Sequence, residues 1–284
     1  MDKSTSFLLN VKKRSIDLSS PVVMGILNIT PDSFFDGGKY SGKDAILFQT
    51  DKMLNEGAAI IDVGAFSSRP GADEITEEEE LNRLIPALRL LIDKFPEAIF
   101  SVDTFRSNVA RIAIENGAHI INDISGGTFD DDMFTTIADL NVPYVLMHIK
   151  GTPRNMQDNP QYVDVVQEVK YFFKNQLRKL KNVGVTSNVI LDPGFGFGKT
   201  LKNNYELLKD ISIFKDLGFP VLVGISRKSM INKVLNISPS EALNGTTVLN
   251  TVALLNGANI LRVHDVKEAV EAVRLVDIYG EIER

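Results

Sequence analysis

Short runs of apolar residues, rich in valine and isoleucine, recur along this chain between longer segments of mixed character. The runs are continuously apolar rather than alternating, which is typical of parallel strands covered on both faces. Eight runs qualify as strands, and they begin near residues 22, 59, 98, 119, 143, 188, 220 and 259. The pattern therefore predicts a parallel β-sheet of eight strands.

The segments between these runs carry apolar residues at spacings of three and four, which predicts amphipathic helices. Two clear examples are EEEELNRLIPALRLLIDKF and VVQEVKYFFKNQLRKLKNVG. A weak repeat, EGAAIID, NGAHIIN and NGANILR, places Gly57, Gly117 and Gly257 between a helix and the following strand. Glycine in that position closes a helix in the left-handed conformation. The chain thus reads as strand and helix in alternation.

Eight strand–helix units in about 260 residues are the size of a (β/α)8 TIM barrel, with an α/β fold and active site at the carboxyl ends of the strands. An open doubly wound sheet is the alternative architecture. No linker-like segment or change of composition divides the chain. We therefore expect one domain over residues 1–284, with residues 1–20 packed on the barrel as an N-terminal extension.

Composition narrows the classes of function. The net charge of −6 over 284 residues argues against general binding to nucleic acid or to an anionic membrane. The chain has no cysteine, which excludes disulfides, thiolate nucleophiles and cysteine-ligated zinc. Neither a signal peptide nor an apolar run of about 18 residues is found, so we expect a cytoplasmic protein.

Polar residues gather where the predicted strands end. A single one is explained by helix capping, but eight strands ending in this way predict a shared polar site, because buried polar groups must be paired or bound. The candidates are Asn28, the segment SSRPG after the second strand, Asp103, Asn122, Asp123, His148, Asp192, Ser226, Arg227, Lys228, Arg262 and His264.

Two connections are longer than the two to six residues usual after a strand. The first, NITPDSFFDGGKYSG, spans residues 28–42, and its Phe34 and Phe35 are expected either to anchor the loop or to close over a flat ligand. The second contains SSRPGADEITEEEE. Its acidic run, Glu77 to Glu80, is expected to form a solvated first helical turn.

Several cations share the rim of an otherwise acidic protein, and the guanidinium fork of arginine suits phosphate oxygens. These cations are Arg69, Arg227, Lys228, Arg262 and the titratable His264. For any one of them, an ion pair with a neighbouring carboxylate is the simpler explanation. Taken together they favour an anionic ligand.

Carboxylates at the same mouth would repel an anion, so we expect a pocket with two halves. Asp103, Asn122 and Asp192 would face a flat, uncharged group rich in N–H donors, and the cations would face phosphate. An ionised aspartate accepts two parallel N–H donors from such a group. A hard, oxygen-ligated Mg²⁺ is the metal that suits this chemistry.

The stretch DPGFGFGKT, Asp192 to Thr200, ends like a phosphate-binding P-loop. It does not match the template, because Pro193 occupies the first glycine position, and the glycines at 194, 196 and 198 also miss the G-x-G-x-x-G spacing. We expect Asp192 to face a ligand and the glycines to bring the backbone close to it. Lys199 is expected at the surface or at a helix cap.

The strand ends together resemble the signatures of dihydropteroate synthase, in the order of that family and from about residue 22 to residue 266. The matching segments are MGILNITPDSFFDGG, SSRPGA, SVDTFR, INDISGG, MHIKGTPRNMQ, ILDPGFGFGKT, GISRKSM and LRVHDV. The resemblance implies a TIM-barrel transferase of folate biosynthesis, commonly a homodimer that uses Mg²⁺. It would join (7,8-dihydropterin-6-yl)methyl diphosphate to 4-aminobenzoate, giving 7,8-dihydropteroate and diphosphate.

The resemblance also implies roles for individual residues. The catalytic residues would be Asp36, Lys228, Arg262 and His264. The pterin would be bound by Asp103, Asn122, Met147, Asp192, Phe197, Gly224 and Lys228. The diphosphate would be bound by Asn28, Arg69, Arg262 and His264, with Asn28 also at the metal. The aminobenzoate pocket would be formed by Phe34, Ser67, Ser68, Pro70 and Ser226.

A dissociative mechanism fits these substrates, because an arylamine is a weak nucleophile and an electron-rich pterin supports positive charge on its methylene group. Closed loops would exclude water from the cation, and Asp36 is a candidate for stabilising it. Two residues depart from the family pattern: Phe66 replaces an acidic residue and Ser68 a threonine. We expect these changes to affect loop position and the fit of aminobenzoate analogues such as sulfonamides.

Three other functions are compatible with parts of the pattern. A barrel methyltransferase acting on a methylated tetrahydrofolate would share the pterin-binding carboxylates, but it would not need the first long loop or the cations of SRK and RVH. A non-catalytic pterin-binding paralogue would have lost loop or anion-binding residues. A Schiff-base aldolase would use Lys228, with a pKa lowered by Arg227.

Overall fold

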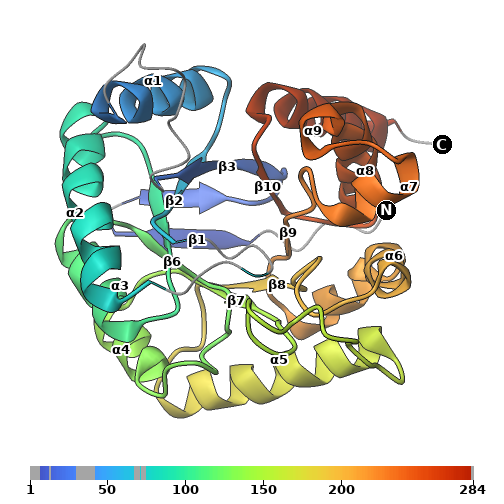
Figure 1. Cartoon of the computed structure of the whole chain (residues 1–284), viewed down its shortest axis with the longest axis horizontal. Coiled ribbons are helices and arrows are strands. Elements are labelled where there is room, and N and C mark those ends of the chain that lie inside the picture. Colours follow the sequence, from blue (N-terminus) through green and yellow to red (C-terminus); the bar gives the residue numbers. More distant parts are fainter. Residues whose placement is uncertain (1–6, 13, 30–41, 67–70, 72–74, 283–284) are drawn as a thin grey trace.

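Eight parallel strands form a barrel in the computed structural model (Figure 1), which describes residues 7–12, 14–29, 42–66, 71 and 75–282. The neighbour order is β8-β7-β6-β5-β4-β3-β10-β9, and β8 and β9 meet at a bridge between Leu191 and Val221. The strands are β3 Val22–Asn28, β4 Ile60–Gly64, β5 Phe100–Asp103, β6 Ile120–Asp123, β7 Tyr144–Met147, β8 Val189–Asp192, β9 Leu222–Val223 and β10 Ile260–Val263.

Helices surround this barrel (Figure 1). They are α1 Gly42–Asn55, α2 Glu77–Lys94, α3 Ser107–Glu115, α4 Met133–Leu140, α5 Val165–Asn182, α6 Leu201–Lys209, α7 Ser229–Leu235, α8 Leu243–Leu255 and α9 Val266–Glu281, with short 3-10 turns at Ile211–Leu217 and Pro239–Glu241. Every predicted strand is confirmed, and each begins within two residues of its expected start. Pairing of β3 with β10 rules out the open doubly wound sheet.

The helix ends follow the local sequence. Thr76 caps α2 by accepting a hydrogen bond from the backbone N–H of Glu79 at 3.2 Å, and Asp164 caps α5 in the same manner. Gly57, Gly117 and Gly257 have positive φ values of 100°, 104° and 100°, as their positions after helices predict. These caps fix where the chain turns back into the barrel.

The acidic run at the start of α2 is less solvated than expected. Glu80 is fully buried and pairs with the half-buried Arg106, whose Nη2 also donates to the backbone oxygen of Ile75 at 2.7 Å. The expectation of a solvated turn was therefore wrong for Glu80. An arginine reaching across from the start of α3 compensates its burial.

The floor of the barrel is apolar and is covered by an N-terminal hairpin. Strands β1 (Leu8–Val11) and β2 (Arg14–Asp17) pair antiparallel, and Leu9, Val11 and Ile16 bury their side chains against the barrel floor. The floor residues contributed by the barrel strands are Met24, Ile60, Ile120, Val145, Ile190, Leu222 and Ile260. The prediction of a single domain over residues 1–284 stays a prediction.

The floor residues show which later residues of each strand face the barrel interior. Side chains on a strand alternate with a period of two, so the residue two positions after each floor residue points the same way. These residues are Ile26, Asp62, Asn122, Met147, Asp192, Gly224 and Arg262. An apolar layer is thus followed by a polar one toward the carboxyl end of the barrel. Within the described part of the chain, no helix is long and apolar enough to cross a membrane.

Candidate active site

Arg262 organises the polar layer of the barrel. Its Nε donates to Oδ2 of Asp62 at 2.7 Å, and its Nη2 donates to Oδ2 of Asp103 at 3.0 Å. Asn122 Nδ2 donates to the same oxygen of Asp62 at 2.9 Å. Strands β4, β5, β6 and β10 therefore share one hydrogen-bonded network, which brings three predicted site residues together.

Asp62 belongs to this network and is absent from the predicted site. It is fully buried inside β4, where it lies opposite Ser101 of β5. A charged residue within the apolar run IIDVG, two positions after the floor residue Ile60, was the signal for it. The prediction considered only strand ends, so it missed an aspartate in the middle of a strand.

The network holds two unsatisfied acceptors. Among the described residues, Oδ1 of Asp62 and Oδ1 of Asp103 are buried side-chain oxygens without a hydrogen-bond partner. Burial raises the pKa of Asp103 above its ordinary value, and the neighbouring Arg262 guanidinium opposes that rise. Buried acceptors of this kind cost free energy until donors reach them. The site is therefore prepared for a ligand that carries N–H groups.

Asp192 lies at the end of β8, opposite Met147 of β7. Its Oδ1 accepts a hydrogen bond from the backbone N–H of Gly194 at 2.7 Å, which starts the turn of the glycine-rich stretch. Burial raises the pKa of this carboxyl, while the ammonium of Lys228 lowers it. Asp192 and Lys228 thus act on each other as a buried pair of opposite charge.

Lys228 closes this side of the site. Its Nζ lies 4.7 Å from the centroid of the Phe197 ring and donates to the backbone oxygen of Phe195. Burial lowers the pKa of Lys228 to about 8, and the carboxylate of Asp192 opposes that shift. A Cβ on Gly224 would lie 3.8 Å from Cβ of Arg262 and 3.9 Å from Nζ of Lys228. Gly224 therefore leaves the space between the two cations open.

Asn28 ends β3 beside Gly64 of β4. A Cβ on Gly64 would lie 3.6 Å from Oδ1 of Asn28 and 3.9 Å from Oδ2 of Asp103, so the absent side chain leaves room between these oxygens. Across the described residues, no group of three or more His, Cys, Asp or Glu is arranged to hold a metal. A single amide oxygen fits a Mg²⁺ that keeps water and substrate oxygens as its other ligands.

Ser226 and His264 form a separate pair at the rim. Oγ of Ser226 accepts the backbone N–H of His264 at 3.2 Å and lies 3.1 Å from its Nδ1. Arg227 instead binds Asp265 through two nitrogens, with Nε at 2.9 Å from Oδ2. The simpler explanation, an ion pair with a neighbouring carboxylate, therefore holds for Arg227.

Lys199 is not at the surface or at a cap. Only 3% of it is exposed, and its Nζ contacts backbone oxygens and Nδ1 of His148. The side chain turns inward because the glycine-rich stretch folds over it, and Thr200 takes the cap of α6 instead. The expectation for Lys199 was wrong.

Phe66, one of the departures from the family pattern, packs in an apolar cluster. Its ring meets that of Phe105 edge to face at 5.4 Å between centroids, and Phe105 meets Phe129 at 5.5 Å. Met147 and Phe197 belong to the same cluster. The phenylalanine therefore extends an apolar wall that runs up to the predicted pterin slot.

Six of the predicted site residues lie outside the described part of the chain. They are Phe34, Asp36, Ser67, Ser68, Arg69 and Pro70. The remaining predicted residues all lie at the carboxyl end of the barrel, in or beside the polar layer described above. Their roles in binding stay predictions.

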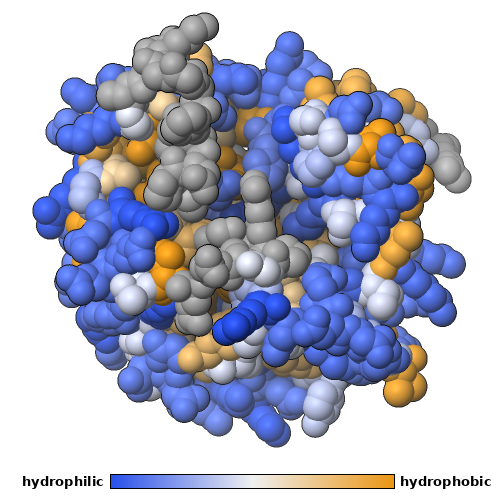
Figure 2. Space-filling model, in the orientation of Figure 1, coloured by the Kyte–Doolittle hydropathy of each residue, from blue (hydrophilic) through white to orange (hydrophobic). Residues whose placement is uncertain are grey.

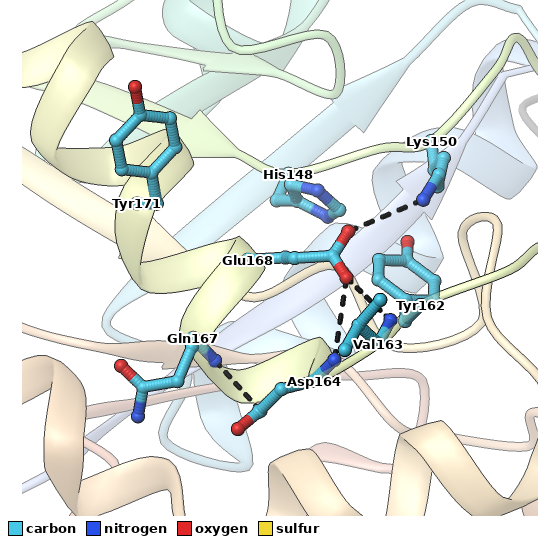
Figure 3. A pocket seen from close by; sticks show the side chains of 8 residues that line it. All are labelled: His148, Lys150, Tyr162, Val163, Asp164, Gln167, Glu168 and Tyr171. Carbon is cyan, nitrogen blue, oxygen red and sulfur yellow. Dashed lines mark hydrogen bonds and ion pairs between the residues drawn. The ribbon is translucent and has the colours of Figure 1, made fainter.

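A hollow of about 410 Å³ lies elsewhere, between the start of α5 and the connection from β7 (Figure 3). Glu168 reaches across it toward Lys150, at 3.4 Å, and toward the backbone N–H of Val163, at 2.8 Å (Figure 3). Its lining is His148, Lys150, Tyr162, Val163, Asp164, Gln167, Glu168 and Tyr171. Of these, only His148 was among the polar strand-end candidates, and its Nδ1 lies 2.9 Å from Nζ of Lys199 rather than in the polar layer around Arg262.

Comparison with known proteins agrees with this architecture. The family model for pterin binding enzymes matches residues 24–264. Dihydropteroate synthase of Escherichia coli (strain K12) is 47% identical over 264 residues, which are 93% of this chain and 93% of that protein. The chain belongs to the pterin binding enzymes.

Solved structures of dihydropteroate synthases are also similar to this chain. Yersinia pestis dihydropteroate synthase in complex with a sulfonamide drug superposes with a TM-score of 0.92 at 41% identity, covering 97% of this chain and all of that one. The Xanthomonas albilineans enzyme with 4-aminobenzoic acid gives 0.91 at 37% identity, covering 98% and 100%. Within its family, the chain is grouped with the dihydropteroate synthases, transferases of folate synthesis.

Proposed function

We propose that the polar layer around Arg262 is where this transferase joins (7,8-dihydropterin-6-yl)methyl diphosphate to 4-aminobenzoate. The observation that carries the assignment is the pair of buried carboxylate oxygens, Oδ1 of Asp62 and Oδ1 of Asp103, that have no donor among the described residues. The pyrimidine edge of a pterin offers several N–H groups on one flat ring. Such an edge satisfies acceptors that the protein leaves open.

The pterin half of the site lies between β5, β6 and β8. Asp103, Asn122 and Asp192 supply hydrogen-bonding groups, and the apolar wall of Met147 and Phe197 supplies a surface for the ring. Gly224 leaves the space that the ring would occupy beside Lys228. The ligand is uncharged at this edge, so it avoids repulsion from the carboxylates.

The diphosphate half lies at the rim, where Arg262, His264 and Arg69 would meet the anion. Arg262 already gives Nε and Nη2 to carboxylates, and its guanidinium carries five N–H donors in total. Ser226 orients His264 by contact with Nδ1. These cations would stabilise diphosphate as it leaves, and Arg262 and His264 are already held in place by their hydrogen bonds.

Mg²⁺ is proposed as the cofactor, held by Asn28 and by oxygens of the substrate's diphosphate. When bound, the ion neutralises charge on the diphosphate. The protein contributes few ligands of its own, which agrees with the habit of Mg²⁺ to bind through water and phosphate.

A dissociative path is the mechanism that we propose. The bond between the pterin methylene carbon and the diphosphate oxygen breaks, leaving a cation stabilised by the pterin ring, and the amine of 4-aminobenzoate then attacks that carbon. No general base is needed before the C–N bond forms. Asp36 is the proposed stabiliser of the cation, and Phe34, Ser67, Ser68 and Pro70 would shape the aminobenzoate pocket with Ser226.

The proposed assembly is a homodimer formed through α7, α8 and α9. Apolar side chains are exposed along these helices, and Figure 2 shows hydrophobic patches over them. Examples are Val234 at 54%, Val248 at 52%, Leu275 at 72% and Ile278 at 60%. Exposed apolar patches of this kind mark interaction surfaces. Sedimentation equilibrium tests this assembly. A wild-type protein that sediments as a monomer, with the same mass in Val248→Lys, would contradict the dimer.

The cytoplasm is the proposed compartment, because a charged pterin diphosphate does not cross a bilayer unaided. Cell fractionation tests this.

The reaction itself is tested by incubating the protein with the pterin diphosphate, Mg²⁺ and labelled 4-aminobenzoate. Labelled dihydropteroate is expected, together with one equivalent of diphosphate. A parallel reaction with EDTA should lose turnover while pterin affinity, measured by calorimetry, stays the same. Absence of labelled product from the complete mixture would overturn the proposed function.

A further inference from the structure

Lys199 is a buried cation surrounded by acceptors. Its Nζ lies 2.9 Å from the backbone oxygen of Gly194, 3.0 Å from that of Phe197 and 2.9 Å from Nδ1 of His148. The backbone oxygen of His148 is a fourth contact at 3.3 Å. An ammonium carries three N–H donors, so each hydrogen has an acceptor. Burial lowers the pKa of Lys199 well below its ordinary value, and the carboxylate of Asp192 opposes that shift. The charge is therefore kept only through these acceptors and that carboxylate.

The contact with His148 defines the state of that imidazole. An ammonium can only donate, so with Lys199 charged Nδ1 is the acceptor of this 2.9 Å contact, and the neutral ring then carries its proton on Nε2. Burial and the nearby cations Lys199 and Lys150 lower the pKa of His148 well below its ordinary value. His148 faces the outer hollow on one side (Figure 3) and Lys199 on the other.

The glycine-rich turn lies directly on the chain after β7. A Cβ on Gly194 would lie 1.9 Å from the backbone oxygen of His148, and one on Gly198 would lie 2.2 Å from that of Lys150. Both glycines have positive φ, +70° and +64°. Only glycine permits this approach. Lys199 ties the two segments together from the buried side, and Gln157 and Tyr162 also bind the turn, at the backbone oxygens of Gly196 and Gly198.

The hydrogen bonds of Lys199 affect two residues of the proposed pterin site. Lys199 binds the backbone oxygens of Gly194 and Phe197, and the N–H of Gly194 in turn binds the carboxylate of Asp192. Lys199 therefore holds both ends of the turn that orients Asp192 and carries the Phe197 ring, while Lys228, Gln157 and Asn204 bind the residues between them. Lys199 itself binds only backbone oxygens of the turn and His148, not the Asp192 carboxylate or the Phe197 ring.

We propose that Lys199, held by His148, is a positioning residue for pterin binding. Its ammonium fixes the turn between Asp192 and Phe197, and its positive charge favours the ionised form of the Asp192 carboxylate. This inference rests on the proposed function and adds to it a residue that touches no substrate.

The effect of Lys199 on the protonation of Asp192 depends on the other charged groups that face this carboxylate. The cations that face Asp192 are Lys228, Arg262 and Lys199, and the backbone N–H of Gly194 also stabilises its ionised form. Loss of one cation makes protonation of this carboxylate easier. A protonated Asp192 would present a donor to a donor edge, so pterin affinity should fall at a higher pH than in the wild type.

The test compares Lys199→Met with two variants of His148, the residue whose Nδ1 contacts Lys199: His148→Leu and His148→Asn. Leucine at position 148 removes the acceptor of Lys199, whereas asparagine is of similar size and places an amide oxygen near the position of Nδ1. Affinity for 6-hydroxymethylpterin, affinity for inorganic diphosphate with Mg²⁺, and urea unfolding are measured for each full-length protein between pH 5.5 and 8.5.

Lys199→Met is expected to weaken pterin binding at least tenfold, to leave diphosphate binding within twofold, and to shift the fall in pterin affinity to higher pH. His148→Leu should weaken pterin binding without that pH shift, because Lys199 remains, and His148→Asn should restore affinity. Wild-type pterin affinity in Lys199→Met would overturn the proposal. If that variant does not fold, equal pterin affinity in His148→Leu and His148→Asn would overturn it instead. A wild type that binds no pterin would refute the proposed function, which is a separate outcome.

Discussion

Nε of Arg262 lies 2.7 Å from Oδ2 of Asp62, although 200 positions separate the two residues in the chain. The contact joins β10 to β4 across the barrel interior, above the apolar floor. It fixes the arginine before any substrate arrives, because a second carboxylate, Asp103, holds the Nη2 end. The cation that we propose for diphosphate binding is thus also a structural part of the barrel.

Removal of the charge on Asp62 should destabilise the fold. In Asp62→Asn the shape is kept, but Arg262 loses a fully buried counterion, and we expect a loss of about 2–4 kcal/mol in the free energy of unfolding. Urea denaturation measures this loss of stability. Glu97→Gln is the control, because Glu97 is 89% exposed in its ion pair with Arg14 and should change stability by less than about 1 kcal/mol. Equal effects of the two variants would contradict the structural role of Asp62.

Asp192→Asn should weaken pterin binding selectively. The amide oxygen still accepts the N–H of Gly194, so the turn is kept, but the other oxygen becomes a donor that faces a donor edge. We expect a loss of about 2–3 kcal/mol, roughly 100-fold in Kd, by calorimetry with a pterin. Asp216→Asn, at a surface carboxylate that pairs with Lys170, should bind pterin normally. Unchanged affinity in Asp192→Asn would remove this residue from the site.

Gly224→Ala should block the pterin without disturbing the fold. The added Cβ would meet only ordinary contacts, at 3.8 Å from Cβ of Arg262 and 3.9 Å from Nζ of Lys228, but it would fill the space between them. We expect an unchanged urea midpoint and a pterin Kd raised about tenfold or more, on the order of the cost of overpacking. Gly280→Ala, where a Cβ meets nothing within 4 Å, should leave pterin affinity unaltered.

Acid should destabilise the protein through His119. Burial, with the charges of Lys12 and Arg14, lowers the pKa of His119 to about 4. Between pH 6.5 and pH 4 the unfolded chain therefore binds a proton that the folded chain does not, and stability falls as the pH falls. The expected loss is on the order of 1–2 kcal/mol for a half-buried group.

His119→Asn supplies the comparison for that prediction. Nδ1 of His119 accepts the backbone N–H of Phe100 at 3.2 Å, and an asparagine oxygen can replace it without titrating. Urea unfolding at pH 7 and pH 5 should show a smaller loss in the variant than in the wild type. The same loss in both proteins would assign the acid sensitivity to other groups.

The strand pattern was sufficient to predict the barrel, because eight continuous apolar runs with helices between them admit few architectures. The strand pattern could also have identified Asp62. This residue comes two positions after the floor residue Ile60, so the two side chains point to the same side of β4. Lys199 could not be found in this way. Its burial depends on how a glycine-rich turn lies on the neighbouring chain, which involves backbone conformations at Gly194 and Gly198 rather than a periodic pattern. Glu80 was misjudged for a similar reason, since its partner Arg106 comes from another helix.

The position of β10 in the chain has a consequence for synthesis on the ribosome. Strands β4, β5 and β6, which carry Asp62, Asp103 and Asn122, are made before β10, and Arg262 follows Asn122 by 140 residues. Until then the two carboxylates have no cation from β10, and β3 has no partner on that side. The nascent chain therefore gains the charge balance of its site and the closure of its barrel in the same step, when the last strand is delivered.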